Sequence, residues 1–289
     1  MNPTTQLAEL AERRALSVER YVAVRRLTES LAAPLSAEDQ TIQSMPDASP
    51  TKWHRAHTTW FFETFVLRPH LPSYREFHPA YGYLFNSYYE AVGPRHPRPE
   101  RGLLSRPSKA EIAAYRAHVD AAMERLVATA SVELWLEIAP LFELGLNHEE
   151  QHQELILMDI KHALSMNPLQ PAYAAPRPLE RRAAPPLSFV ELQGGLAEIG
   201  HAGADFAFDN EGPRHKVFVA PFRLASRLVT CAEYLAFIAD GGYQRAESWL
   251  SEGWATLQRE AWTAPLYWQR EDEAWSLFTL QGQRRLDDA

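Results

Sequence analysis

The 289-residue sequence contains a single cysteine, Cys231, which excludes an internal disulfide and a cysteine-rich zinc site. It has no apolar run near the ~20 residues that cross a bilayer, and residues 1–21 lack the apolar segment of a secretory signal. Basic residues are outnumbered, 29 against 37 acidic ones, and the net charge of -8 argues against a nucleic-acid partner. We therefore predict a cytoplasmic protein without a nucleic-acid or membrane partner, in which Cys231 has a structural role.

The first half of the chain has the pattern of a helical domain. Apolar residues at helical spacing predict four helices, over residues 5–34, 49–67, 108–130 and 132–165. Residues 70–107 have little periodicity and predict a long ordered loop, whose many aromatic residues favour a functional role. Four helices with one long crossover fit a helical bundle, and the core of a bundle is a common place for a metal site.

Two of these helices begin with recognisable capping signals. Ser49 is expected to cap the second helix, where Pro50 suits the first turn because that position needs no N–H donor. Ser108, followed three residues later by Glu111, predicts a capping box for the third helix.

A Pro-rich segment divides the chain. Residues 169–186 have no apolar period and predict a linker between a helical domain, residues 1–168, and a second domain, residues 187–289. In the second domain, alternating segments around glycine turns predict short strands, and VTCAEYLAFIADGGY predicts a short helix that ends at Gly241 and Gly242. The predicted fold class is α+β.

The strongest chemical signal is the segment LGLNHEEQHQELILMDIKHAL. His148 and His152 are four residues apart, so a helix places both imidazoles on one face, where they can share a metal ion. Apolar residues on both sides place this helix in a buried position, although a solvated helix with incidental histidines is the alternative. HEEQH also matches the HExxH pattern of zinc proteases, with Glu149 as the general base, but no HxxGxxH extension supplies a third ligand.

A third imidazole is available in the segment KWHRAHTTW. His54 and His57 lie one turn apart, and spacing alone does not separate them. One of them, added to the later pair, would form a three-histidine face that leaves roughly three positions open on an octahedral ion. Imidazole suits iron, zinc and copper alike, so these residues do not name the metal.

Arginines concentrate in the segment EAVGPRHPRPERGLLSRP; they are Arg95, Arg98, Arg101 and Arg106. Guanidinium groups bind carboxylates bidentately, and the intervening prolines would stiffen the loop. This pattern predicts capture of a small anionic substrate, with an exposed basic loop as the alternative.

Four segments together closely resemble one enzyme family, the ergothioneine-biosynthesis sulfoxide synthases of the EgtB type. In the family's order they are SPTKWHRAHTTWFFETFVL, FNSYYEAVGPRHPRPERGLLSRP, LNHEEQHQELILMDIKHAL and FAFDNEGPRHKVFVAPFRLASRLVTCAEYLAFI. The resemblance implies an N-terminal DinB-like four-helix bundle followed by a partial formylglycine-generating-enzyme (sulfatase-modifying-factor)-like domain, related to C-type lectins. It implies an enzyme that uses iron(II) and O2 to join hercynine to a thiol, γ-glutamylcysteine or cysteine, giving a hercynyl sulfoxide.

The resemblance also implies roles for single residues, carried over motif by motif. The iron ligands are His57, rather than His54, with His148 and His152. Gln151, directly before the last ligand, corresponds to the glutamine that contacts hercynine. The pair that holds the thiol substrate corresponds to Arg98 and Arg101.

Several alternatives stay open at this point. The family's second domain is longer and holds a tyrosine proton donor in its later part, so we expect a C-terminally truncated chain without that donor and with little turnover. The paralogous selenoneine synthases, which use a selenosugar, share the bundle and the metal motif. A zinc hydrolase that uses Glu149 and a non-catalytic DinB-like module are the other candidates. Glu149→Gln should abolish activity in the hydrolase and be mild in the oxygenase.

Overall fold

A computed structural model describes residues 3–178, 183–272 and 274–286. The chain divides into two compact units, Met1–Ala174 and Ala175–Ala289. The first is helical and the second combines helices with strands, which confirms the predicted α+β class. Among the helices of these described ranges, none combines the length and the apolar character that a membrane crossing requires.

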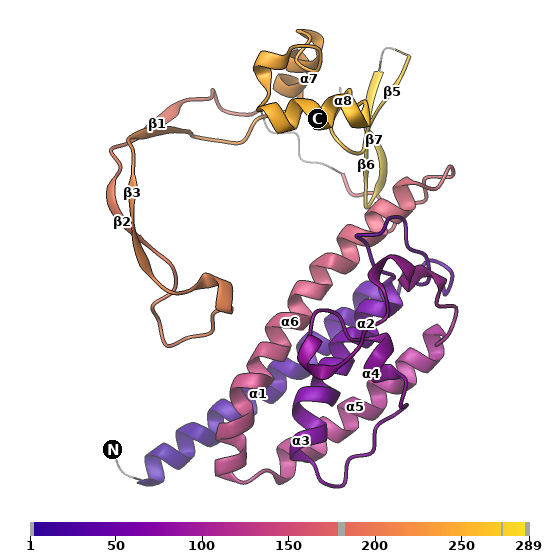
Figure 1. The fold of residues 1–289 in the computed structure, drawn as a ribbon, viewed down its shortest axis with the longest axis vertical. Coiled ribbons are helices and arrows are strands. Elements are labelled where there is room, and N and C mark those ends of the chain that lie inside the picture. Colours follow the sequence, from indigo (N-terminus) through magenta and orange to yellow (C-terminus); the bar gives the residue numbers. More distant parts are fainter. Residues whose placement is uncertain (1–2, 179–182, 273, 287–289) are drawn as a thin grey trace. The chain divides into compact units, whose positions relative to one another are not determined.

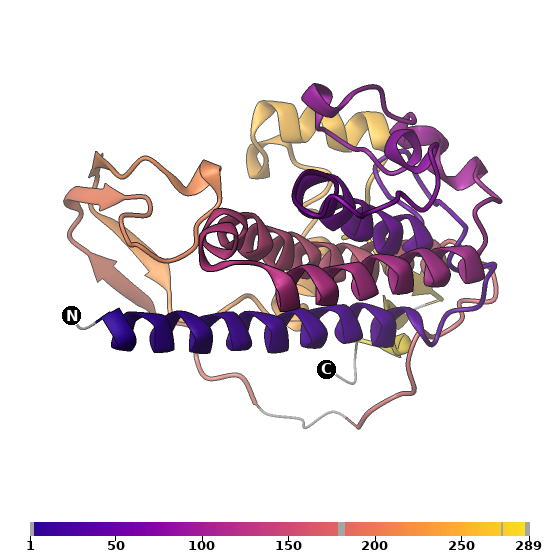
Figure 2. The ribbon, with the colours of Figure 1, turned by 90° about the horizontal axis from the view of Figure 1, so that it is seen from below.

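Four long helices build the first unit (Figure 1). They are α1 (Pro3–Ala32), α2 (Thr51–Phe61), α5 (Lys109–Thr129) and α6 (Val132–Ser165). Helix α6 packs against both α1 and α2, and α2 also packs against α5. Figure 2 shows α1 lengthwise along one side of this unit. The four predicted helices are confirmed, although the second one does not stay a regular α-helix to residue 67: a wider π turn, Phe62–Leu67, and a short α3, Arg68–His70, follow α2.

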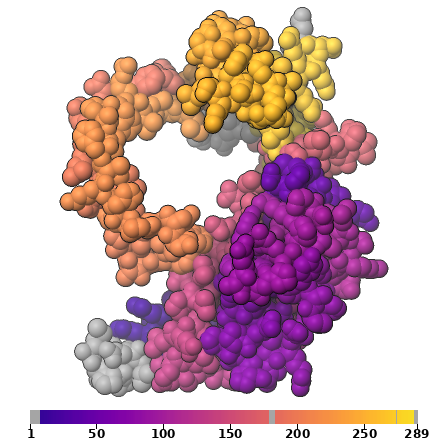
Figure 3. Space-filling view, in the orientation of Figure 1, coloured from indigo at the N-terminus to yellow at the C-terminus, as the bar shows by residue number. Residues whose placement is uncertain are grey.

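Apolar side chains from all four helices fill the interior of this unit. The largest fully buried ones include Trp60, Phe61, Phe62, Tyr115 and Phe142. In the space-filling view these helices form a continuous packed body (Figure 3). Gly145 of α6 permits a close approach, because a Cβ at this position would lie 2.6 Å from a ring carbon of Phe62. Replacement of Gly145 by alanine would therefore push α6 away from the segment that follows α2.

The capping predictions have different outcomes. Ser108 and Glu111 form the predicted capping box at the start of α5. The prediction that Ser49 caps α2 is wrong, since no side-chain hydrogen bond caps this helix. Ser49 has other partners: its N–H donates to Asp159 over 2.8 Å, and its hydroxyl accepts from Arg101 over 2.9 Å. The start of α2 is buried and is satisfied in another way, since the N–H of Lys52 donates to the carbonyl oxygen of Gln40 over 3.0 Å.

The predicted long loop between α3 and α5 is ordered by buried polar contacts. It contains α4 (Tyr81–Leu84) and two short 3₁₀ helices, Glu90–Val92 and Arg98–Leu103. Near its start, the buried Glu63 carboxylate accepts hydrogen bonds from the hydroxyls of Tyr74 and Tyr115 and from the N–H of Phe77. These contacts tie the first part of the loop to the bundle.

The second unit begins with a long antiparallel ribbon in two sections. Its strands are β1 (Phe189–Leu192), β2 (Gly195–Ile199), β3 (His215–Val219) and β4 (Phe222–Ala225). Strand β1 pairs with β4, and β2 pairs with β3. The ribbon is interrupted at Gly194, where φ is +69° and an added Cβ would lie 2.2 Å from the carbonyl oxygen of Val219.

The rest of the second unit is a pair of helices and a three-stranded meander. These elements are α7 (Cys231–Ala239), α8 (Ser251–Glu260), β5 (Trp268–Glu271), β6 (Ala274–Thr279) and β7 (Gly282–Arg285). The predicted short helix is confirmed as α7, and Gly241 follows it with a φ of +80°. Strand β6 pairs with both β5 and β7 in antiparallel register.

Candidate metal centre

Three histidines from two helices converge inside the first unit. His57 lies on α2, and His148 and His152 lie on α6. One ring nitrogen of each residue can be chosen so that all three nitrogens lie within 4.8 Å of one another. The Nε2 atoms of His57 and His148 are 3.2 Å apart. These distances allow three imidazoles to share one cation.

His57 is held in a defined orientation. Its Nδ1–H donates to the carbonyl oxygen of Phe85 over 2.6 Å, which leaves the Nε2 lone pair directed at the other two histidines. The ring is stacked between Trp53 and Trp60, with centroid distances of 4.6 and 5.5 Å and interplanar angles of 12° and 15°. A backbone acceptor and two indole faces therefore set the position of this imidazole.

The structure separates His54 from His57, which spacing could not do. His54 is buried, and its Nδ1 lies 2.8 Å from Nδ1 of His152. Its Nε2 lies 3.0 Å from a carboxylate oxygen of Asp159. His54 thus contacts a member of the trio through Nδ1, and it is not one of the three residues whose ring nitrogens converge.

Burial keeps the three converging imidazoles neutral. Desolvation lowers the pKa of His57 and of His152 well below the usual value, and the neighbouring histidines lower both further. Desolvation also lowers the pKa of His148 to about 4. At neutral pH each ring therefore offers a lone pair, which is the state that a metal ion requires. Three converging neutral nitrogen donors fit a divalent transition-metal ion.

A cavity of about 510 Å³ borders the trio. Its lining includes Trp53, Tyr88, Tyr89, Gln151 and Leu155 in addition to the three histidines and His54. Gln151 is exposed on α6 directly before His152, so its amide can reach a molecule bound beside the metal position. The cavity has room for a small substrate next to the three rings.

Two of the four loop arginines, Arg98 and Arg101, line this cavity. The buried Arg101 donates to the hydroxyls of Ser49 and Ser87 over 2.9 and 3.2 Å. Its guanidinium lies 3.4 Å from the ring centroid of Trp53, and the same indole stacks on His57. Burial and the nearby Arg98 lower the pKa of Arg101 to about 9, which leaves the group cationic at neutral pH.

Arg98 and Arg101 have only neutral hydrogen-bond partners in the described ranges. Arg98 donates to the hydroxyl of Tyr88 over 2.7 Å and to the carbonyl of Asp47. Among the residues that the structure places, no carboxylate lies within 4.0 Å of either guanidinium. By contrast, Arg95 donates to the Ser87 carbonyl and Arg106 lies 3.7 Å from Glu111. Two cations without a carboxylate in direct contact make this side of the cavity suited to an anionic group.

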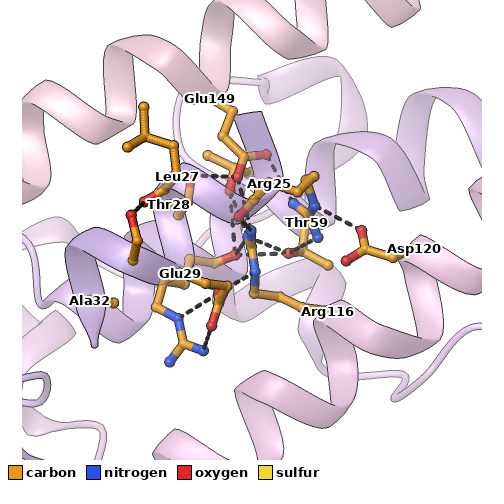
Figure 4. A network of polar contacts seen from close by, with 12 residues as sticks. Arg25, Leu27, Thr28, Glu29, Ala32, Thr59, Arg116, Asp120 and Glu149 are labelled. Atoms are coloured by element: carbon orange, nitrogen blue, oxygen red, sulfur yellow. Dashed lines mark hydrogen bonds and ion pairs between the residues drawn. The ribbon is translucent and has the colours of Figure 1, made fainter. Parts of the chain in front are cut away.

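Glu149 does not face the trio. Its fully buried carboxylate accepts hydrogen bonds from Arg25 and Arg116, each over 2.9 Å, and from the Thr28 hydroxyl over 2.7 Å (Figure 4). Burial raises the pKa of Glu149, but the two guanidinium groups outweigh it and lower the pKa to about 2. A general base must reach the substrate, and this carboxylate is enclosed in an ion-pair network. The geometry therefore argues against the zinc-hydrolase alternative.

Sequence reasoning missed two residues of the site. Asp159 follows His152 by seven residues, two turns along the same face of α6, and this spacing could have indicated it. Trp53 carries no sequence signal for its double stacking against Arg101 and His57, because that contact joins a loop to a helix.

Comparison with known proteins matches both units to characterised families. Residues 20–156 match the DinB superfamily, and residues 175–284 match the sulfatase-modifying factor enzyme 1-like domain. The hercynine oxygenase of Mycolicibacterium thermoresistibile is 34% identical over 230 residues, 77% of this chain and 48% of that protein. The hercynine oxygenase of Mycobacterium tuberculosis is 31% identical over 228 residues, 78% of this chain and 51% of that protein. A third relative with the same name, from Mycolicibacterium smegmatis, is 34% identical over 129 residues.

These matches confirm the predicted order of a DinB-like helical domain and a sulfatase-modifying-factor-like domain. The chain spans about half the length of the first two curated relatives.

Proposed function

This chain is an EgtB-like homologue of the hercynine oxygenases, and we propose that it binds iron(II) for the O2-dependent joining of hercynine to a sulfur donor. The observation that carries the proposal is the convergence of His57, His148 and His152 beside a cavity that two arginines also line. Neutral imidazoles suit a redox-active metal, and unpaired guanidinium groups suit a carboxylate-bearing substrate. The relatives' name supplies hercynine as the other substrate.

Each cavity residue has a proposed task in this reaction. The three histidines hold the metal, and bound iron(II) would supply one-electron chemistry toward dioxygen and open positions for substrates. Gln151 orients the hercynine imidazole through its amide. Arg98 and Arg101 hold the carboxylates of the thiol, γ-glutamylcysteine or cysteine, so that its sulfur lies at the metal position.

Trp53 and Trp60 contribute by excluding water from one side of the metal position. Both indoles cover faces of the His57 ring, so solvent cannot approach the metal from behind this ligand. Exclusion of water limits side reactions of a reactive oxygen species and strengthens the charge interactions of the two arginines.

Iron binding is the first test of the proposal. The protein should bind one iron(II) per chain under anaerobic conditions, and His57→Ala should abolish this binding because a ligand is removed. His118→Ala is the matched control, since His118 hydrogen-bonds a backbone carbonyl elsewhere on the bundle. Preference for zinc, with iron-independent peptide cleavage, would contradict the proposal.

Oxygen uptake is the second test. The iron-loaded protein should consume O2 only when hercynine and a sulfur donor are both present, and γ-glutamylcysteine, cysteine and a selenosugar are compared as donors. Uptake in the presence of hercynine with the selenosugar, but with neither thiol, would reassign the chain to selenoneine synthesis. Stoichiometric iron without uptake for any donor would contradict the catalytic part of the proposal for this chain.

A further inference from the structure

Beside the three converging histidines lies a row of buried polar groups to which the proposed reaction assigns no task. It runs from the Asp159 carboxylate to His54 over 3.0 Å and from His54 to His152 over 2.8 Å. His54, His152 and Asp159 are all at most 9% exposed. The row joins α2, which carries His54, to α6, which carries the other two residues.

The chemistry of the three groups fixes the direction of both hydrogen bonds. A carboxylate can only accept, so Nε2 of His54 carries the proton that Asp159 receives. A neutral His54 then has a lone pair on Nδ1, which accepts from Nδ1–H of His152. His152 is left with its lone pair on Nε2, the ring nitrogen on the opposite edge from His54. A proton on Nε2 instead would prevent this atom from binding a metal.

We infer that Asp159 and His54 act as a positioning relay, which holds His152 in the tautomer and ring orientation that present Nε2 to the metal. The inference rests on the proposed function, because it takes His152 as a metal ligand. The carboxylate end is itself fixed, since the same oxygen of Asp159 also accepts the N–H of Ser49 over 2.8 Å. The charged Asp159 carboxylate, two hydrogen bonds away, also makes the His152 imidazole a stronger electron-pair donor to the metal.

The other two ligands are supported differently. His57 donates to the backbone carbonyl of position 85. Any residue at that position would provide this acceptor as long as the backbone keeps its geometry. Nδ1 of His148 is buried and has no hydrogen-bond partner among the residues that the structure describes. Among those residues, only His152 of the three has a side-chain hydrogen-bond partner outside the trio, so its orientation is the one that substitution can test directly.

Two substitutions of His54 separate the relay from simple packing. The side-chain oxygen of His54→Asn takes the place of Nδ1 and can still accept from His152, whereas His54→Gln places its amide near the former Nε2 and loses that acceptor. We expect cobalt(II) affinity, measured by titration against a competing chelator, to fall by about 10–100-fold in His54→Gln. His54→Asn should stay within about threefold of the unaltered protein, since the contact to His152 survives.

The visible spectrum of the cobalt(II) protein provides a readout that packing alone does not move. Absorption bands should shift in His54→Gln, because the His152 ring turns, and should be retained in His54→Asn. Thermal midpoints of the metal-free variants show whether both remain folded, and His118→Asn serves as the control for loss of a histidine elsewhere.

The outcomes distinguish this inference from the proposed function. Equal affinities and spectra for the Asn and Gln variants would overturn the relay while leaving the metal site in place. Failure of the unaltered protein to bind cobalt(II) or iron(II) would instead overturn the proposed function.

Discussion

At the scale of single residues, identical side chains have different tasks because of the atoms around them. His54 and His57 lie within one turn of α2, yet His54 contacts a carboxylate and His57 is a member of the trio. Glu149 lies beside His148 in the chain but belongs to a separate ion-pair network. The residue type suggests a chemistry, and the neighbouring atoms decide whether it is used.

Arg101 gives a prediction at this scale. Arg101→Lys should weaken binding of γ-glutamylcysteine about tenfold, because an ammonium group loses the forked contacts and the stacking on Trp53. Iron affinity should be unchanged. Quenching of tryptophan fluorescence by the thiol measures the effect.

Arg106→Lys is the matched control, since Arg106 is exposed on the same loop and does not line the cavity. Equal losses in both variants would contradict a specific contact between Arg101 and the thiol, because both changes keep the loop's charge.

At the scale of elements, α6 combines a candidate metal site with a structural ion-pair network. His148 and His152 lie on the face that meets the cavity, while Glu149 points toward arginines of α1 and α5 (Figure 4). The network joins three helices, so it sets how α6 is rotated about its axis. That rotation determines where the two imidazoles lie.

Glu149→Gln tests this division of tasks. The change leaves Arg25 and Arg116 buried without their shared counter-charge, so we expect the free energy of unfolding to fall by about 3–5 kcal/mol. Iron stoichiometry should be kept in the folded protein. Urea denaturation and metal analysis measure the two effects.

Glu150→Gln is the control for this prediction. It removes an exposed carboxylate that pairs with Arg20 at the surface, where we expect a change of at most about 1 kcal/mol. A folded Glu149→Gln protein without metal would contradict this division of tasks, and a peptide-cleaving activity that this change abolishes would return support to the zinc-hydrolase alternative. For the metal site, the sequence-based prediction that Glu149→Gln has a mild effect remains a prediction. For the free energy of unfolding, we expect a large effect instead.

At the scale of the whole molecule, every residue of the candidate site lies in the first unit, and its buried histidines make that unit sensitive to pH. The pKa of His148 is about 4 when folded, against a usual value of 6.5. Between these values the unfolded chain binds more protons than the metal-free folded protein, so stability rises with pH across this range.

Metal-free protein should therefore lose about 3 kcal/mol from His148 as the pH falls from 6.5 toward 4. The contribution is complete above pH 6.5 and is lost as the pH approaches the folded pKa. Urea denaturation at a series of pH values checks this, and His148→Gln should have a shallower slope over the same interval. Equal slopes for both proteins would show that His148 is not buried in its neutral form.

The sequence by itself determined the helices, the capping box at Ser108 and the pairing of His148 with His152, because each depends on spacing along one chain segment. Motif resemblance selected His57, Arg98 and Arg101, and these remain proposals as functional residues. Only the tertiary structure assigned His54 and Asp159 to a buried row, placed Trp53 between a guanidinium and an imidazole, and enclosed Glu149 with two arginines. The physical reason is that helical periodicity fixes which residues share a face, whereas packing between helices decides what each face meets.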